Sequence, residues 1–258
     1  MARNFHSAPA AEDEPGPTDA LFVQSLARGM SVLEAFRGAE GPLSLAQIAA
    51  RSGMTRSAAQ RLVHTLRRLG YLIQAEDGRG FRPHLPILDL THDFMRLNPL
   101  VRRANPILLE LRRSVRERVD LSLFDGQRMV YVTRMQSKRE IFFATLVGKS
   151  VPVTGSSGGW AVLAMLPPAE ADAILAQAPL HPVTPRTLTD PDAIRAQLAL
   201  VRETGHALAL EQMLMGEVAL GVAIPDASGR PVGAIHIVAS LSEWEPEEFR
   251  RRVAPLAA

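Results

Sequence analysis

The chain reads LAQIAARSGMTRSAAQRLVHTLRRL over residues 45–69, and this stretch decides the fold of its N-terminal part. The apolar residues at its start recur at helical spacing and stop at Gly53, because glycine adopts the left-handed backbone that ends a helix at little cost. Thr55 is the expected N-cap of a second helix over 56–69, since its hydroxyl can accept a bond from a backbone N–H of the first turn. The pattern predicts two helices joined by a tight turn, followed by two short strands around the Gly-Arg-Gly of residues 78–80.

The second of these helices has an apolar face and a polar face. Its apolar side chains, which we expect to be buried, are Ala59, Leu62, Val63, Leu66 and Leu69. Its outward side chains are Ser57, Gln60, Arg61, His64 and Arg68. Side chains of these types meet base edges and phosphates when a helix enters the major groove of DNA. We therefore predict DNA contacts by Thr55, Arg56, Ser57, Gln60, Arg61, His64 and Arg79.

A polar helix face is also typical of any helix that simply meets solvent. The local charge favours the DNA-binding interpretation here. Residues 51–82 hold seven arginines, no lysine and two acids, so this segment carries five positive charges while the whole chain carries a net charge of +2. Such a concentration is typical of a surface that binds phosphates, and arginine suits bidentate contacts to guanine or phosphate.

The composition excludes several classes of protein. The 258 residues include no cysteine, which excludes disulfides, thiolate nucleophiles and Cys-ligated zinc and fits a reducing compartment. No group of His, Asp and Glu has the spacing of a metal site, and we expect neither a metal nor a cofactor. No apolar run approaches the roughly 20 residues of a membrane helix. No basic segment followed by a hydrophobic block marks the N-terminus, so we expect a cytoplasmic protein with no membrane partner.

The distribution of proline, glycine and apolar residues predicts four parts. Residues 1–20 are rich in proline and acids and predict a flexible tail, and residues 21–83 hold the helix-turn-helix unit. Residues 84–98 predict a connecting helix, whose apolar side chains at three- and four-residue steps are Ile87, Leu90, Phe94 and Leu97. Residues 99–258 begin with a long amphipathic helix and continue with alternating strands, among them a hairpin at Asp125-Gly126, mixed with helices. This last part predicts an α+β domain with an antiparallel sheet and flanking helices.

Several stretches together carry a resemblance to one family. They are Phe22–Phe36, Leu43–Tyr71, Asp125–Val132, Val147-Gly148, Val151–Val153 and the part from Gly205 onward. In combination they resemble the isocitrate lyase regulator (IclR) family of bacterial transcription factors. The resemblance implies a winged helix-turn-helix DNA-binding domain, a linker helix and a GAF-like effector-sensing domain, in a protein that assembles as homodimers or homotetramers.

The run Gly155-Ser156-Ser157-Gly158-Gly159 follows an expected strand over 151–154 and allows two interpretations. It matches the G-x-S-x-G turn that exposes the nucleophilic serine of many hydrolases. Such a serine needs a histidine base and an acid, and the available partners are His206 or His236 and Asp190 or Asp192. No further hydrolase motif supports this reading. Alternatively, the small residues form a cradle where a carboxylate meets backbone N–H groups and the positive end of a helix dipole.

In the resembling family this loop forms one wall of the effector pocket. Its members commonly carry His-Ala-Thr-Ala-x-Gly-Lys-Ala there, whereas this chain has TGSSGGWA at 154–161, so Trp160 is either a packing residue or a lid over the ligand. The opposite wall is expected from residues 209–219 and the last strand. There the commonly acidic position is Ala209 and the usual cysteine is Ala219, so no known effector is carried over. We predict effector contacts by Phe143, Ser156, Ser157, Gly158, Glu211, Met213, Glu217, Ala219 and His236.

These features predict a ligand-responsive transcriptional regulator of a catabolic operon, acting as repressor or activator, rather than an enzyme. We expect its effector to be a small carboxylate, with aromatic acids among the candidates. The expected partners are a double-stranded DNA operator, the effector and further copies of the chain. Two alternatives stay open: a serine hydrolase that uses the turn at 155–159, and a winged-helix protein that has lost its ligand.

Overall fold

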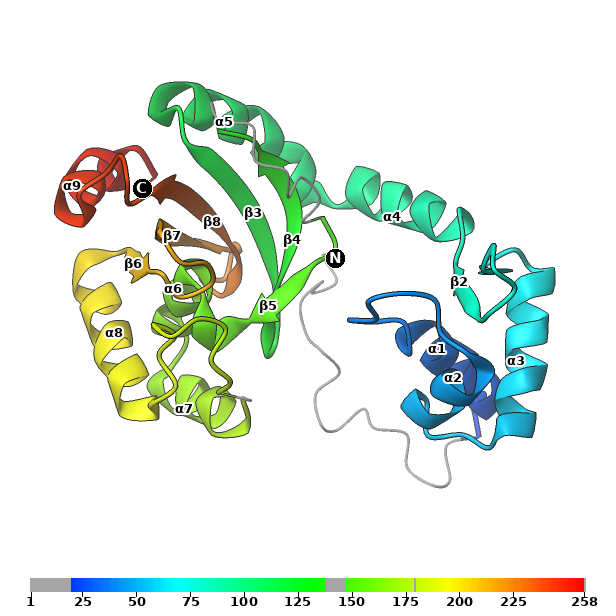
Figure 1. Cartoon of the computed structure of the whole chain (residues 1–258). Coiled ribbons are helices and arrows are strands. Elements are labelled where there is room, and N and C mark those ends of the chain that lie inside the picture. The colour runs from blue at the N-terminus through cyan, green and yellow to red at the C-terminus, as the bar shows by residue number, and fades with distance from the viewer. Residues whose placement is uncertain (1–19, 138–146, 179, 258) are drawn as a thin grey trace. The chain divides into compact units, whose positions relative to one another are not determined.

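The chain forms two compact units, which follow one another along the sequence with Asn98 ending the first and Pro99 beginning the second (Figure 1). The computed structural model describes residues 20–137, 147–178 and 180–257. The elements of the first unit are α1 (Gln24–Glu34), α2 (Leu45–Arg51), α3 (Arg56–Arg68), β1 (Leu72–Gln74), β2 (Phe81–Pro83) and α4 (Pro86–Leu97).

The first three helices and the strand pair enclose a small apolar core. Its buried members include Val32 of α1, Ile48 of α2 and Val63 of α3. Leu69 was expected on the buried face of α3, and this expectation is wrong: the helix ends at Arg68, and Leu69 is 61% exposed. The cause is the turn that follows, because the chain leaves the helix there and bends at the next residue.

The strand pair β1–β2 forms the wing of a winged helix-turn-helix. The two strands are antiparallel, and Leu43 exchanges backbone hydrogen bonds of 2.9 and 2.8 Å with Phe81 of β2. At the turn Gly80 has φ +98°, and a Cβ there would lie 2.8 Å from the carbonyl oxygen of Leu43. Only glycine combines this backbone angle with such a close approach. The wing is therefore held against the segment that leads into α2.

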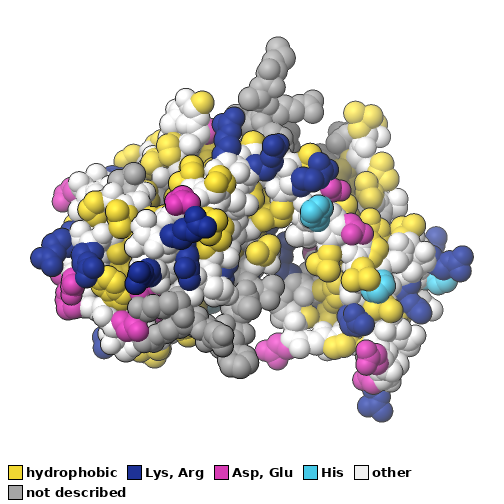
Figure 2. Space-filling model, turned by 90° about the horizontal axis from the view of Figure 1, so that it is seen from above, with side chains coloured by type: hydrophobic (Ala, Val, Ile, Leu, Met, Phe, Trp, Pro, Cys, Tyr) yellow, Lys and Arg dark blue, Asp and Glu magenta, His cyan; other side chains and the backbone are white. Residues whose placement is uncertain are grey.

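Helix α4 has an apolar face that nothing in its own unit buries. None of its residues is buried, and the apolar side chains in and just before it that are at least half exposed are Leu85, Leu88, Leu90, Phe94 and Leu97. Figure 2 shows hydrophobic side chains sharing the visible surface with scattered arginines and lysines. A helix with such an exposed face is typical of a surface that packs against a partner.

The second unit is an antiparallel sheet with helices on both faces. Its elements are α5 (Pro99–Val115), β3 (Arg118–Asp125), β4 (Arg128–Met135), β5 (Ser150–Pro152), α6 (Ser157–Met165), α7 (Pro168–Gln177), α8 (Pro191–Thr204), β6 (Ala207–Leu210), β7 (Glu217–Pro225), β8 (Pro231–Ser240) and α9 (Pro246–Ala257). The strands lie in the order β5-β4-β3-β8-β7-β6, and every neighbouring pair is antiparallel. Helices α5 and α9 pack on one face, and α6 packs on the other together with α7 and α8 (Figure 1).

The central strand β3 decides what lies on each face. Its residues from Val119 to Phe124 are all buried, so both faces of the strand are covered. Because side chains alternate along a strand, Asp120 and Ser122 point toward α6, and their apolar neighbours point the other way. The face under α6 therefore carries buried polar groups, which is where a site can be built.

The expected hairpin at Asp125-Gly126 is confirmed, with Gly126 at φ +64° between β3 and β4. The expected strand over 151–154 is partly wrong, because β5 ends at Pro152 and the next three residues form a short 3₁₀ turn into α6. Strand β6 was not predicted. The sequence also predicts a strand over 141–146, which contains Phe143 and lies outside the described residues.

Within the described parts of the chain, no helix combines the length and the apolar character needed to cross a membrane. Over the same residues, no group of three or more His, Asp and Glu side chains is arranged to hold a metal ion.

Candidate DNA-binding face and effector cavity

The N-terminal end of α3 is built by a side-chain cap. Thr55 Oγ1 accepts a hydrogen bond of 3.3 Å from the backbone N–H of Ala58 and lies 3.3 Å from the hydroxyl of Ser57. No acid occupies the first turn of α3, so the positive end of the helix dipole is not opposed there by a side chain of the helix. Such an end suits a phosphate. Thr55 therefore fixes where the helix starts, whatever further contacts its exposed side makes.

The predicted DNA-contacting side chains lie on the surface of the first unit. All are exposed, namely Thr55, Arg56, Ser57, Gln60, Arg61, His64 and Arg79. Among the described residues no acid forms an ion pair with Arg56, Arg61 or Arg79. Their charges are thus available to a phosphate or a base edge.

The wing carries Arg79 at its tip, on a turn fixed by local bonds. The backbone N–H of Arg79 donates to Asp77 Oδ1 at 2.9 Å, and Gln74 Nε2 donates to the carbonyl of Gly78 at 3.0 Å. The guanidinium of Arg67 lies 5.5 Å from the ring centre of Phe81, a cation–π contact that joins α3 to the wing. Helix α3 and the wing are therefore in direct contact.

The second unit contains a small cavity between the sheet, the start of α6 and the loop after β6. Its lining residues are Arg118, Tyr131, Ser156, Ser157, Ala209, Glu211, Gln212, Met213, Glu217, Ala219, His236 and Val238. Its volume is about 30 Å³, which is room for about one or two water molecules. A larger ligand would need the cavity to widen.

Most of the predicted effector-binding residues surround this cavity. Those that line it are Ser156, Ser157, Glu211, Met213, Glu217, Ala219 and His236. Gly158 is not among the lining residues: it lies beneath the ring of His236, where a Cβ would be 2.3 Å from the ring carbon Cε1. Phe143 lies outside the described residues.

The expected anion cradle at the start of α6 is closed in this structure. The N–H of Gly159 already donates to Ser156 Oγ at 3.1 Å, as an N-cap bond. Strand β7 packs tightly against the peptide that joins Ser157 to Gly158. A Cβ on Gly221 would lie 2.5 Å from the backbone nitrogen of Gly158. Trp160 is a packing residue rather than a lid, since it is 2% exposed and donates to the carbonyl of Thr154 at 2.6 Å. The loop thus contributes serine side chains to the cavity, not open backbone donors.

His236 lies on β8 at the floor of the cavity and is bonded on both sides. Its Nε2 is 2.7 Å from Ser122 Oγ, its Nδ1 is 3.4 Å from Ser157 Oγ, and its ring centre is 5.1 Å from that of Tyr131. Burial lowers the pKa of His236 to about 4, although Asp120 acts in the opposite direction. The imidazole is therefore neutral at pH 7, and each serine can bond one ring nitrogen.

A chain of charged groups runs beside the histidine. Arg134 donates to both oxygens of Asp120, at 2.8 and 2.9 Å, and Asp120 accepts from Nε of Arg118 at 3.1 Å. Arg118 reaches Glu217 through Nη1 at 2.8 Å and Nη2 at 3.4 Å. Burial acts to lower the pKa of Arg118, but the nearby Asp120 and Glu217 carboxylates raise it above its usual value. Arg118 is thus a permanently charged group at the cavity wall.

Sequence reasoning missed Arg118, Tyr131 and Gln212 as lining residues. For Arg118 a signal was present: residues 118, 120 and 122 are polar and alternate with apolar ones along the predicted strand. Such alternation usually means a solvent-facing side. Here that side is covered by α6, and it becomes the polar floor of a cavity.

The geometry does not support a serine hydrolase. Ser157 lies near His236, but both residues are buried, and the other ring nitrogen meets the hydroxyl of Ser122 rather than a carboxylate. Ser157 also lies in the first turn of α6 and does not have the positive φ of a strained turn. Asp190 caps α8 and Asp192 pairs with the exposed Arg195, so neither acid completes a triad.

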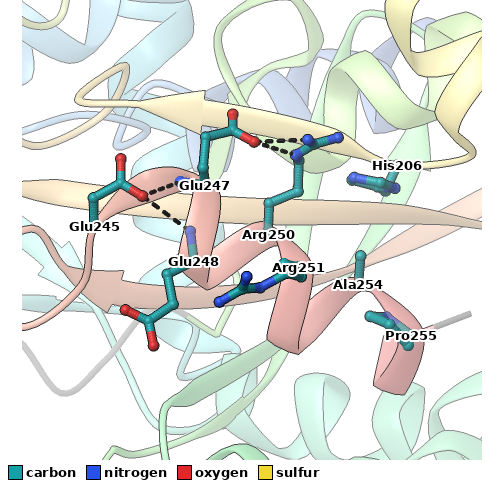
Figure 3. Close-up of a pocket in the computed structure, with 8 residues that line it drawn as sticks. All are labelled: His206, Glu245, Glu247, Glu248, Arg250, Arg251, Ala254 and Pro255. Carbon is teal, nitrogen blue, oxygen red and sulfur yellow. Dashed lines mark hydrogen bonds and ion pairs between the residues drawn. The ribbon is translucent and has the colours of Figure 1, made fainter.

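A second hollow lies over α9 and is shown in Figure 3. It is a wide-open depression of about 500 Å³, lined by His206, Glu245, Glu247, Glu248, Arg250, Arg251, Ala254 and Pro255. Its charged groups bind one another: Glu245 accepts from the N–H groups that begin α9, and Glu247 pairs with Arg250. None of the predicted effector-binding residues lines it, so the candidate ligand site is the smaller cavity.

Comparisons with known proteins indicate the same family over nearly the whole length of the chain. Residues 25–76 match the IclR helix-turn-helix domain, and residues 93–258 match the domain described as bacterial transcriptional regulator IclR C-terminal. The chain is 32% identical over 235 residues to the HTH-type transcriptional regulator Rv1719 of Mycobacterium tuberculosis, covering 91% of this chain and 87% of that protein. It is 29% identical to the Pca regulon regulatory protein of Pseudomonas putida, covering 99% of this chain and 88% of that protein.

A solved structure of similar fold holds a ligand. It is an IclR homolog from Microbacterium hydrocarbonoxydans complexed with 4-hydroxybenzoate, with a TM-score of 0.70 and 25% identity, covering 90% of this chain and 97% of that one. A winged helix-turn-helix with exposed arginines, joined in one chain to this α/β unit, defines a DNA-binding transcriptional regulator. The chain belongs to the IclR family of bacterial transcriptional regulators, and it is not an enzyme.

Proposed function

We propose that the chain is a ligand-responsive regulator of a catabolic operon, which binds its operator through α3 and the wing and a small carboxylate through the cavity of the second unit. The observation that carries the proposal is the cavity itself, where a mostly buried arginine and neutral hydrogen-bonding groups converge on one space. The relative that holds 4-hydroxybenzoate supports an aromatic acid as one candidate effector.

The proposed regulator binds DNA as a dimer or a dimer of dimers. The exposed apolar face of α4 supports this, because two copies that cover it would remove leucine and phenylalanine side chains from water. Two recognition helices bind one duplex when they lie about one helical turn apart or a multiple of it. An effector that prefers one arrangement of the two copies therefore changes operator affinity by its difference in affinity for the two arrangements.

The test compares DNA binding and effector binding in one set of variants. Fluorescence anisotropy with fragments from the region beside the gene measures DNA affinity, and calorimetry with 4-hydroxybenzoate and other small carboxylates measures effector affinity. Arg61→Ala should weaken operator binding by about 5- to 150-fold, the equivalent of about 1–3 kcal/mol for a base contact. It should leave effector binding unchanged, because Arg61 and the cavity lie in different units.

The matched control is Arg113→Ala, which removes the same charge from an exposed position on α5. The Arg113→Ala control should bind the operator as tightly as the unmodified protein does. If the dimer contacts about six phosphates, the slope of log K against log salt should be near −5. Equal losses in Arg61→Ala and Arg113→Ala, or affinity that does not change with salt, would contradict the assignment of α3. DNA binding that no carboxylate alters would favour a regulator that has lost its ligand.

A further inference from the structure

The two terminal nitrogens of Arg118 can bind one carboxylate at the wall of the cavity, and in this structure they bind that of Glu217. The two terminal nitrogens of Arg118 lie 2.8 and 3.4 Å from the two oxygens of Glu217. Both side chains line the cavity and are mostly buried, at 13% and 19% exposure. A guanidinium recognises a carboxylate through such a pair of parallel bonds. The space next to Arg118 is thus already shaped for one carboxylate group.

Arg118 also binds Asp120, so its position does not depend on Glu217. Its Nε donates to Asp120, whose two oxygens are in turn fixed by Arg134. Asp120 and Arg134 lie on the adjacent strands β3 and β4 and are 1% and 8% exposed. The bonds among Arg118, Asp120 and Arg134 remain when Glu217 no longer binds Arg118.

Glu217 is held in a different way. It is the first residue of β7, and it follows Gly216, whose φ of +78° ends the loop over 211–216. The first two residues of this loop are held by hydrogen bonds. Thr184 donates to the carbonyl of Glu211, and the side chain of Gln212 bonds to the backbone of Leu188 and Arg186. The rest of the loop exposes Leu214 and Met215, at 54% and 49%, and its last residue, Gly216, is held by bonds to Glu211 and Leu241. Among the described residues, Arg118 is the only hydrogen-bond partner of the Glu217 side chain. Glu217 is therefore the partner of Arg118 that can leave.

We propose that the carboxylate of the effector replaces Glu217 on Arg118, so that Arg118 is the residue that selects a carboxylate and Glu217 is its internal competitor. Two carboxylates on one guanidinium repel each other, so the side chain of Glu217 turns away from Arg118 as the ligand enters, while its backbone stays paired in β7. The same movement widens a cavity that now holds about one or two water molecules. This inference rests on the proposed function, since it specifies how the same cavity recognises its ligand.

The test is Glu217→Gln, which removes the competing charge and changes the shape of the side chain very little. The matched control is Glu211→Gln, because Glu211 also lines the cavity but bonds to the backbone N–H of Gly216 and not to Arg118. Calorimetry with acetate, pyruvate, benzoate and 4-hydroxybenzoate, and with acetamide, benzamide and 4-hydroxybenzamide as neutral counterparts, measures each affinity.

Glu217→Gln should bind the carboxylate probes about tenfold more tightly than the unmodified protein, a fold-change at the low end of measured couplings between close charges. Glu211→Gln should stay within about twofold of the unmodified protein, an effect too small for a lost close charge pair. The amides should gain nothing from Glu217→Gln. The effect on the unmodified protein is checked directly by a crystal structure with a bound acid, in which the acid lies on Arg118 and the distance from Arg118 Nη1 to Glu217 Oε1 has increased from 2.8 Å.

The outcomes separate this inference from the function on which it rests. If carboxylates bind the unmodified protein and Glu217→Gln binds them equally or more weakly, the competitor role of Glu217 is overturned while the effector function stands. A crystal structure in which the acid binds elsewhere and the pair of Arg118 and Glu217 persists would overturn it as well, even if the variant fails to fold. If none of the acids binds the unmodified protein or Glu217→Gln, both the inference and the carboxylate-sensing function are overturned.

Discussion

His236 should make the effector-binding unit lose stability as the pH falls below about 6.5. Burial lowers the pKa of this histidine from 6.5 to about 4 in the folded chain, whereas in the unfolded chain the ring meets water and keeps its ordinary value. The unfolded state therefore takes up more protons than the folded state between these two values. The stabilisation is fully present above pH 6.5 and is lost as the pH falls through about 4.

The size of the effect follows from the shift. A difference of 6.5 minus about 4 corresponds to about 3 kcal/mol, at 1.36 kcal/mol for each pKa unit. Because a domain of this size is stable by about 5–15 kcal/mol, this is a large share of its total stability. The physical cause is the absence of water around a ring that lies against Tyr131 and bonds to Ser122 and Ser157.

Urea unfolding followed by tryptophan fluorescence measures this unit by itself. The chain has two tryptophans, Trp160 and Trp244, and both lie in the second unit. The comparison is between the unmodified protein and His236→Gln at several values between pH 4 and pH 8. The variant cannot titrate at this position, and the carboxylates that titrate in the same range are common to both proteins. The unmodified protein should therefore lose about 3 kcal/mol more than the variant over this range.

The reasoning is refuted if the two proteins lose stability in parallel. It is also refuted if the ring protons of His236, followed by NMR, titrate near pH 6.5. A titration midpoint near 4, together with parallel unfolding curves, would mean that the unfolded chain also shields this histidine.

The remaining predictions concern packing and buried charge. Gly159→Ala should destabilise the second unit by about 3 kcal/mol or more. A Cβ there would lie 1.9 Å from the carbonyl oxygen of Val153, and a backbone atom cannot move aside as a flexible side chain can. Gly155→Ala is its control and should unfold near the urea midpoint of the unmodified protein, since its Cβ would meet only a sulfur atom at 3.8 Å. Arg134→Ala should cost about 1–3 kcal/mol, because the buried Asp120 loses two charged hydrogen bonds and keeps only its bond to Arg118 among those that the structure shows. Arg134→Lys should recover part of that loss, and equal losses in both variants would argue against a role of the charge.

The DNA-binding unit was largely predictable because its signals are local. Thr55 caps its own helix through a bond to Ala58, and Gly53 has φ +63° at the turn where the sequence predicted a left-handed backbone. The spacing of Ile48 and Val63 reports burial because each helix repeats every 3.6 residues. Such features depend on residues only a few positions apart. The end of α3 was misplaced by one residue, since apolar Leu69 continued the pattern beyond the last helical turn.

The cavity could be predicted only in part. The motif at 155–159 and the segment at 209–219 pointed to its walls, and His236 was among the predicted effector contacts. Arg118 was missed, because polar residues that alternate with apolar ones along a strand usually face solvent, and only the packing of α6 shows that this side of β3 is covered. The anion cradle was misjudged for a similar reason, since the glycine of β7 that closes it lies far away along the chain.

The order of the residues by itself determined that the helices of the first unit and the β3–β4 hairpin form and roughly where they lie, and which unit carries the positive charge. It did so because helix caps, turn glycines and apolar periodicity act between near neighbours. The tertiary structure alone decided that the polar side of β3 is buried, and that Arg118 meets Glu217, 99 residues further along the chain. Sheet order and helix packing bring such groups together, and both depend on the whole second unit closing around its own core.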